Sequence, residues 1–365
     1  MEEINEQPKQ NRYIYIDIAR AFAILCVVLC HAVENVYYTI EWSELSSYSK
    51  YFKIFTFTIG RIGVPIFLCI SGTLLLRKNM ENEDSAIRFY KKNLLPLLIT
   101  TEIWNVIYYV FLCVWNGNNF NFKNLIETML FMRSSEAPNM WYMPMILGMY
   151  LAIPFLANIV KRFSLKVISV PMLVVGIYTV LFPTISILLQ DGDMASRVLD
   201  ISFLGGVYGL YIMLGYYISI SSKIKKVPNF ILGAIVGILY LITVGIQIYL
   251  WNFGIKYNLW YNFLPLFVLG IAIFGLFKKM ENIQIKGKLY QIIYTISNWS
   301  LAVFFIHTIV IYFIRDYINA LGFINPVKVI LLFVITLFIS LIAVKIIKSI
   351  PILKKYLLLI KKEEK

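Results

Sequence analysis

The chain has 365 residues and a net charge of +14; 59% of its residues are hydrophobic and only 15% are charged. Soluble domains carry about 25% charged residues, so this chain has too little polar surface to be one. The excess of lysine and arginine is typical of membrane proteins that follow the positive-inside rule. Because no basic soluble domain is present, we expect no nucleic-acid partner. Lipid is therefore the predicted solvent for most of the chain.

Long apolar blocks recur along the whole sequence. A helix needs about 20 apolar residues to cross roughly 30 Å of hydrocarbon. The blocks predict an all-α, polytopic integral membrane protein of about ten transmembrane helices. The first block is long and no cleavage site follows it, so we predict a retained span and not a signal peptide. The predicted spans are 13–38, 52–76, 93–115, 140–160, 166–189, 203–220, 229–251, 258–277, 299–318 and 328–347.

The basic residues alternate from one predicted loop to the next. The N-terminal tail, every second loop and the C-terminal end together hold 24 of the 34 lysines and arginines, and the intervening loops hold eight. This alternation predicts that both termini are cytoplasmic. We expect residues 1–12 to be a polar cytoplasmic tail, residues 13–350 the membrane domain and residues 351–365 a basic cytoplasmic tail.

The first predicted span carries Arg20 and His31, and Glu34 lies near its outer end. Eleven residues at about 100° each make three turns plus about 20°, so Arg20 and His31 share a helix face, roughly 16 Å apart along the axis. Glu34 is one turn beyond His31. A carboxylate beside a histidine can fix the ring tautomer and stabilise the imidazolium, so the pair is a candidate general base.

Other ionisable residues also fall inside predicted spans, where a charge costs roughly 2.5–3.5 kcal/mol or more. Arg61 lies about ten residues deep in the second span, which favours a functional role over an ion pair that only joins helices. Asp17 equally fits a structural pair with Arg20. His307, in the ninth span, either lines the same cavity or forms hydrogen bonds within the bundle. The four cysteines form no C-x-x-C pair, so we expect no metal.

Four motifs, in chain order, resemble those of the membrane acyltransferase family 3. The first is an arginine followed by ten residues and a histidine, and the second resembles R-x-x-V-P-x-F-F-x-x-S-G. The third is a W-Y-M-P start with a later Y-L-x-x-P, and the fourth resembles S-x-x-S-L-x-x-Y-x-x-H. They occupy Arg20–His31, Arg61–Gly72, Trp141–Pro154 and Ser297–His307. An R-x-x-R motif of the family is replaced here by Arg88 and Lys91, and lysine lacks the bidentate fork of arginine.

The resemblance implies transfer of an acyl group, commonly acetyl, from acetyl-CoA to a hydroxyl of a cell-surface or lipid-linked carbohydrate. It implies a multi-pass protein of a bacterial-type cytoplasmic membrane, whose partners are acyl-CoA, the acceptor and lipid. It implies three sets of site residues. The catalytic residues are His31, Glu34 and Arg61. The donor would bind along Arg20, Ser71, Arg88 and Lys91, and the acceptor at Trp141, Tyr142 and His307.

Simpler explanations compete with several of these assignments. The basic loop 77–92 is also what the positive-inside rule predicts, and Trp141 and Tyr142 also suit an interfacial aromatic belt. Ser71 with Gly72 is typical of close helix packing. An exporter or flippase of a polysaccharide or lipid-linked sugar is the alternative function, since ten spans and prolines within helices suit a transporter too. We find no repeat between the halves of the chain, which argues against it.

Overall fold

The computed structural model describes residues 13–190, 205–255 and 257–360, and all regular structure within these ranges is helical. Eight of the described helical segments are long and apolar enough to cross a membrane, which confirms the prediction of an all-α polytopic membrane protein. The helices and helical turns are α1 (Ile14–Tyr37), η1 (Trp42–Glu44), α2 (Ser47–Arg61), α3 (Gly63–Leu75), α4 (Glu83–Phe89), η2 (Tyr90–Leu94), α5 (Leu95–Asn116), α6 (Phe122–Met129), α7 (Tyr142–Arg162), α8 (Leu165–Gly176), η3 (Ile177–Leu181), α9 (Phe182–Leu189), α10 (Gly206–Ile220), α11 (Lys223–Lys226), α12 (Asn229–Asn252), α13 (Leu264–Lys279), η6 (Met280–Asn282), α14 (Gly287–Ala320), α15 (Asn325–Lys348), α16 (Pro351–Leu353) and η7 (Lys354–Leu358).

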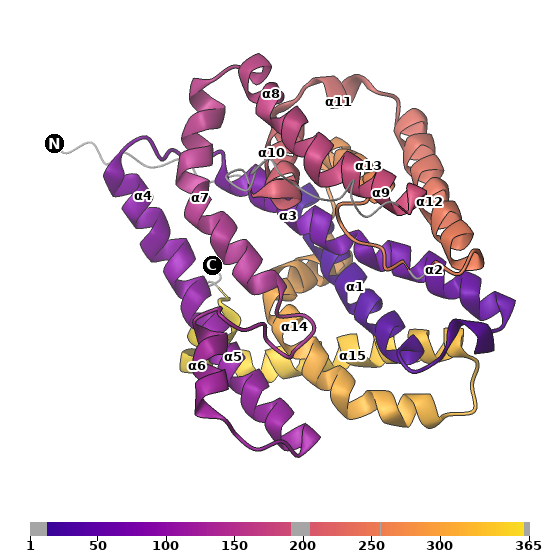
Figure 1. Ribbon diagram of the computed structural model, residues 1–365. Coiled ribbons are helices and arrows are strands. Elements are labelled where there is room, and N and C mark those ends of the chain that lie inside the picture. The colour runs from indigo at the N-terminus through magenta and orange to yellow at the C-terminus, as the bar shows by residue number, and fades with distance from the viewer. Residues whose placement is uncertain (1–12, 191–204, 256, 361–365) are drawn as a thin grey trace.

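Helix α1 lies inside the bundle, where it packs against α2, α3, α13, α14 and α15 (Figure 1). In its most apolar window 67% of the residues are buried, against 17% in α12 and 22% in α15. The two latter helices therefore present most of their apolar side chains outward, as lipid-facing helices do. The polar residues of α1 are thereby placed in the protein interior.

The predicted span 52–76 is broken in the middle. Helix α2 ends at Arg61, Ile62 forms a turn, and α3 begins at Gly63. Pro65 explains the break, because it has no N–H to donate to the carbonyl of Arg61 four residues earlier, and its ring crowds that carbonyl. The break places the Arg61 side chain at the C-terminal end of a helix, where the helix dipole stabilises a cation.

Three other boundaries differ from the sequence-based prediction. The predicted loop 77–92 is helical from Glu83, and α4, η2 and α5 form one 34-residue segment that ends at Asn116. The ninth predicted span is part of α14, which begins at Gly287 and not at 299. The eighth was predicted to begin at 258, but α13 begins at Leu264. Proline at the next position suits the first turn of a helix and disfavours helical backbone before it.

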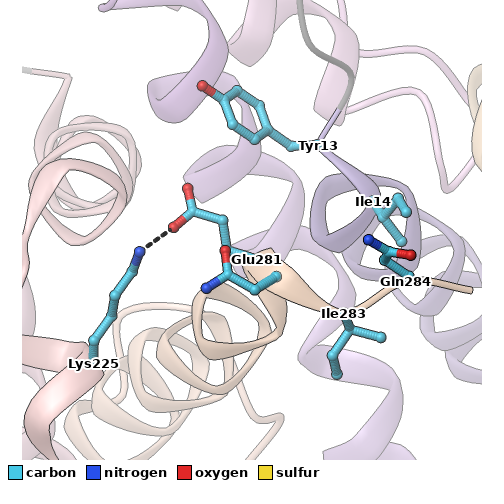
Figure 2. A pocket seen from close by; sticks show the side chains of 7 residues that line it. Tyr13, Ile14, Lys225, Glu281, Ile283 and Gln284 are labelled. Carbon is cyan, nitrogen blue, oxygen red and sulfur yellow. Dashed lines mark ion pairs between the residues drawn. The ribbon is translucent and has the colours of Figure 1, made fainter.

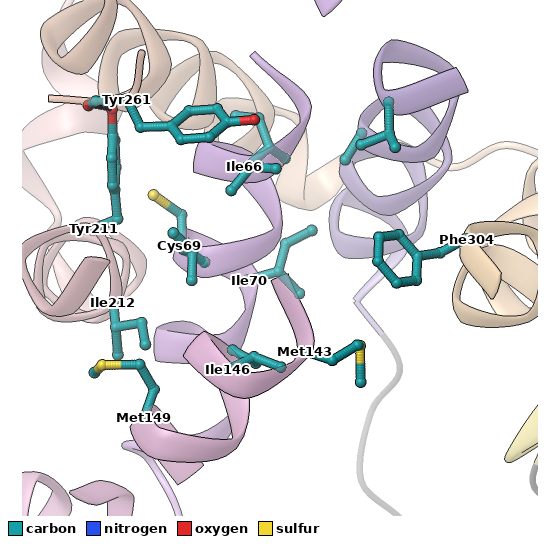
Figure 3. Packing of buried hydrophobic residues seen from close by; sticks show 14 of the residues in the cluster. Ile66, Cys69, Ile70, Met143, Ile146, Met149, Tyr211, Ile212, Tyr261 and Phe304 are labelled. Atoms are coloured by element: carbon teal, nitrogen blue, oxygen red, sulfur yellow. Dashed lines mark hydrogen bonds between the residues drawn. The ribbon is translucent and has the colours of Figure 1, made fainter. Parts of the chain in front are cut away.

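The segment 257–263 is non-helical, yet every second side chain from Leu259 is buried, with Leu259, Tyr261 and Phe263 at 0%, 3% and 0% exposure. Irregular backbone at membrane depth is tolerated only inside protein or along a cavity. Here the protein supplies the missing partners, because the Tyr211 hydroxyl donates to the carbonyl of Tyr261 and the Leu264 amide donates to Thr184. Figure 3 shows Tyr211 and Tyr261 side by side above an apolar layer built from α3, α7 and α10.

The end of the described chain folds back onto the bundle. Thr100 and the indole of Trp104, both on α5, donate hydrogen bonds to the carbonyls of Tyr356 and Leu357. Residues 351–360, which we expected to belong to a tail, therefore pack against α5. The predicted tails 1–12 and 361–365 and the first two residues of the predicted span 203–220 lie outside the described residues, and the total of ten spans and the cytoplasmic termini stay predictions.

Candidate functional site

One turn of α1 carries the candidate base. The Nδ1 atom of His31 lies 2.8 Å from Oε2 of Glu34; the His31 side chain is 12% exposed and that of Glu34 is 34% exposed. The three-residue spacing brings the two groups together without any tertiary contact. A carboxylate only accepts hydrogen bonds, so Glu34 selects the tautomer with a proton on Nδ1. The other ring nitrogen, Nε2, is then the atom with a free lone pair.

Arg61 joins this pair from the end of α2. Its Nη2 atom lies 3.1 Å from Oε1 of Glu34, and its Nη1 atom donates to the hydroxyl of Tyr261 at 3.2 Å. Arg61 is 7% exposed, and its Nε–H has no hydrogen-bond partner among the described residues. The buried guanidinium repays its desolvation only with good geometry and further hydrogen bonds, which Glu34 and Tyr261 supply here.

Two glycines allow α2 and α3 to approach α1 so closely. A Cβ atom on Gly60 would lie 2.7 Å from the Cα of Cys30, and one on Gly63 would lie 2.6 Å from the carbonyl oxygen of Ala23. No side chain fits at either position. Gly60 and Gly63 flank Arg61. By letting the backbones touch, these small residues also bring the Arg61 guanidinium to the turn of α1 that carries Glu34.

Aromatic rings surround the guanidinium. The Arg61 Cζ atom lies 4.6 Å from the ring centroid of Phe57, 5.0 Å from Trp260 and 5.6 Å from Tyr261. Rings at this distance stabilise a cation through their negative faces. We call these three residues the Arg61 cage. Trp141 extends it, since its ring stacks on Tyr261 at 5.6 Å and 26° and lies 5.1 Å from Trp260.

Sequence reasoning missed Trp260 and Tyr261. Both lie at the start of what we predicted to be an ordinary span, and apolar aromatic residues there fit an interfacial belt. The signal that could have found them is Pro265, because proline favours the first turn of a helix and places the residues before it outside that helix. Only the fold shows that the segment before α13 turns inward to Arg61.

His307 lies against His31, but both of its ring nitrogens already have hydrogen-bond partners. The two ring centroids are 5.2 Å apart, and His307 is fully buried. Its Nδ1 lies 3.0 Å from the carbonyl oxygen of Val303, and Thr308 Oγ1 is 3.3 Å from its Nε2. Both partners belong to α14 itself, and the role of His307 at the acceptor stays a prediction.

The remaining predicted residues lie at different distances from this cluster. Tyr142 begins α7 and reaches His307 only through Phe304, whose ring is 5.5 Å from Tyr142 and 6.0 Å from His307. Arg20 is half-buried and interacts electrostatically with Tyr150 on α7. The Ser71 hydroxyl donates to the Phe67 carbonyl of its own helix.

Arg88 and Lys91 are exposed on the segment formed by α4 and η2. Gly72, which follows Ser71 on α3, touches the backbone of α10. A Cβ there would overlap the carbonyl oxygen of Ile212, so this stretch of α3 serves close packing. The structure therefore brings together His31, Glu34, Arg61 and His307, with Trp141 at the edge, and leaves Arg88 and Lys91 on the surface.

The fold and this cluster describe a polytopic membrane protein in which Glu34 is hydrogen-bonded both to His31 and to Arg61. Such a histidine can accept a proton from a hydroxyl, and the arginine can stabilise developing negative charge. The chain belongs to the acyltransferase 3 family, whose acyltransferase-domain model matches residues 13–345. The family predicted from the four motifs is thereby confirmed, and the protein is a membrane acyltransferase. None of the curated proteins or solved structures compared with the chain matches it.

Proposed function

We propose that this acyltransferase moves an acetyl group from acetyl-CoA to a hydroxyl of a cell-surface or lipid-linked carbohydrate in a bacterial-type cytoplasmic membrane, with His31 as the general base. The observation that carries the proposal is the 2.8 Å contact between His31 Nδ1 and Glu34, which leaves Nε2 as the proton acceptor. Family membership supports the acyl transfer.

In the proposed reaction the acceptor oxygen attacks the thioester carbonyl while His31 Nε2 takes the hydroxyl proton. The tetrahedral intermediate then collapses, the carbon–sulfur bond breaks and the coenzyme A thiolate receives that proton from the imidazolium. Glu34 stabilises the imidazolium between the two steps, because a carboxylate at hydrogen-bond distance favours the charged ring. An ester, coenzyme A and the original histidine result, so atoms and charge balance.

Arg61 is proposed to stabilise the oxyanion of the intermediate. Two of its nitrogens are used by Glu34 and Tyr261, and the buried Nε–H is a donor without a partner among the described residues. A buried donor left unpaired costs about 1–3 kcal/mol, so an oxyanion that accepts from it is favoured. Trp141, at the edge of the Arg61 cage, is a candidate surface for the acceptor ring.

The test is acetyl transfer by the purified full-length protein in lipid nanodiscs. Radiolabelled acetyl-CoA and a chemically deacetylated surface glycan serve as substrates, and released thiol is measured in parallel. His31→Ala should lower transfer by at least about 100-fold, the usual contribution of a general base. Size-exclusion chromatography verifies that the variant remains folded. Transfer at the wild-type rate by the folded variant would overturn the assignment.

A further inference from the structure

One charge within the ninth predicted span takes no part in the proposed reaction. Arg315 lies on α14, eight residues past His307, which places it about 12 Å further along the helix axis. A charged side chain within a span is costly unless the protein supplies partners for it. The Arg315 side chain is 28% exposed, with Nε 3.5 Å from the carboxylate of Asp316 and Cζ 4.4 Å from the ring centroid of Tyr312. Asp316 is 72% exposed, so this ion pair contributes little.

A further partner of Arg315 belongs to α1. Arg315 Nη1 donates to Oδ1 of Asn35 at 3.2 Å, and Asn35 Nδ2 donates to the carbonyl oxygen of His31 at 2.8 Å. A guanidinium only donates and a carbonyl only accepts, so the two partners together fix the orientation of the Asn35 amide. We call this connection from Arg315 through Asn35 to His31 the Asn35 bridge. It joins α14 to the turn of α1 that carries the candidate base.

The start of α1 lies too far away to support that turn. There Glu281 on η6 binds Lys225, the pair drawn in Figure 2, and Lys278, with 2.7 Å between the charged atoms in each pair. The ring centroid of Tyr15 on α1 lies 5.4 Å from Lys278 Nζ. Tyr15 is sixteen residues before His31, about 24 Å along the helix axis. The candidate base therefore depends on contacts at the other end of α1.

That end of α1 is the part of the helix that opens most easily. The helix ends at Tyr37, six residues past His31, and its last turn carries no basic residue. The last four carbonyls of a helix lack partners within it, and terminal turns fray. Helix α14 supplies what this turn lacks. Asn319 Nδ2 donates to the carbonyl of Asn35 at 3.3 Å, and Arg315 brings a cation to the negative end of the helix dipole.

Opening of the last turn would separate the candidate base from its carboxylate. Glu34 directly precedes Asn35, and its contact with His31 joins side chains three residues apart. Such a contact requires helical backbone between the two residues. The bond of Glu34 to Arg61 depends on the same stretch of backbone. By tying the His31 carbonyl to α14, the Asn35 bridge holds the segment on which both contacts of Glu34 depend.

We propose that Asn35 and Arg315 are positioning residues for acyl transfer. Asn35 holds the turn in which Glu34 meets His31, and Arg315 acts through Asn35. Both act through the backbone of α1 and not by contact with the substrates. The inference rests on the proposed function, because it concerns the base assigned there. It gives the charge in the ninth span a role in the reaction.

Turnover of acetyl-CoA with the deacetylated glycan tests the proposal on the full-length protein in nanodiscs. Asn35→Leu removes both bonds of the side chain. It should lower kcat by about tenfold and leave the KM for acetyl-CoA within about twofold of wild type, because the base is displaced and the donor site is not. Arg315→Met should lower kcat by about threefold to tenfold, since the lost hydrogen bond is partly exposed.

A double-mutant cycle separates action through Asn35 from an independent effect of Arg315. If Arg315 acts through Asn35, the protein with both substitutions should have the kcat of Asn35→Leu alone, within about twofold, whereas independent effects would multiply. The matched controls are Asn116→Leu, exposed in the last turn of α5, and Arg133→Met, exposed in the loop after α6. Both controls should turn over as wild type.

Hydrogen exchange followed by mass spectrometry reports on the same turn without reference to activity. Peptides that cover residues 31–40 should exchange about tenfold faster in Asn35→Leu and Arg315→Met than in the wild type. Faster exchange with an unchanged kcat would overturn the proposal, because the bridge would then serve stability alone. Multiplying losses in the double variant, or a KM that changes as much as kcat, would overturn it as well. If size-exclusion chromatography shows that Asn35→Leu does not fold, Arg315→Met decides, since its side chain is partly exposed.

The two proposals fail in distinguishable ways. If His31→Ala abolishes transfer and the variants of the Asn35 bridge keep the wild-type kcat, only the positioning role is wrong. If the folded His31→Ala protein transfers acetyl at the wild-type rate, the proposed function is wrong, whatever the bridge variants do.

Discussion

The guanidinium of Arg61 lies 3.2 Å from the hydroxyl of Tyr261, a residue 200 positions further along the chain. This contact joins the break between α2 and α3 to the non-helical segment before α13. Both features interrupt predicted spans, and both precede a proline by four residues: Pro65 after Arg61, and Pro265 after Tyr261. Two local departures from regular helix thus meet at the residue that holds Glu34.

Tyr261→Phe removes the hydroxyl and keeps the ring against Trp141. We expect kcat to fall by about threefold to tenfold, because a single hydrogen bond contributes about 0.5–1.5 kcal/mol. The measurement is acetyl-CoA turnover in nanodiscs. Tyr38→Phe, at an exposed position, is the control and should behave as wild type. An unchanged kcat in Tyr261→Phe would mean that the contact does not help to position Arg61.

Glu34→Gln keeps the shape of the side chain and removes its charge. The amide can turn its NH₂ group toward Nδ1 of His31, which favours the tautomer with the proton on Nε2 and so blocks the base. We expect kcat to fall at least about tenfold, with a smaller change in the KM for acetyl-CoA. A positioning role also predicts partial rescue by Glu34→Asp, which a loss of folding does not.

The control for this variant is Glu44→Gln, an exposed acid on η1 that should leave turnover unchanged. A Glu34→Gln protein that elutes as a folded species and turns over at the wild-type rate would contradict the assignment of Glu34.

Gly60→Ala should destabilise the protein. The added methyl group would lie 2.7 Å from both Cα and Cβ of Cys30, so α1 and α2 must separate. Overpacking of this kind costs about 1–3 kcal/mol, and a lower melting temperature in detergent measures it. Gly237→Ala on α12 is the matched substitution, with open space around the new Cβ. It should melt at or slightly above the wild-type temperature, because alanine is the better helix former.

The predicted topology places the turn before α4 in the cytoplasm and the turn after α5 outside. In intact cells, an impermeant maleimide should label Asn118→Cys directly and Asn79→Cys only after the membrane is opened. Three of the four native cysteines are buried and Cys113 is half-buried, so the unmodified protein serves as the background control. Labelling of Asn79→Cys in intact cells would contradict the predicted orientation.

The sequence was sufficient to predict the contact of His31 with Glu34, because that contact lies within one helical turn. It also predicted the family and the all-helical membrane fold, since both depend on local motifs and on long apolar blocks. The predicted helix ends were wrong where a helix continued beyond the apolar block, as in α14, and where proline delayed its start, as in α13. Hydropathy reports where lipid begins, and helices do not have to end there.

Only the tertiary structure decided what Arg61 contacts. The sequence showed a buried charge without a local partner, and the cost of such a charge required one. Which partner it finds depends on two glycines that let α2 and α3 touch α1, and on an inward-turning segment that brings Tyr261 to it from another part of the chain. Contacts within a turn follow from helical periodicity, whereas contacts between helices follow from how closely their backbones can approach.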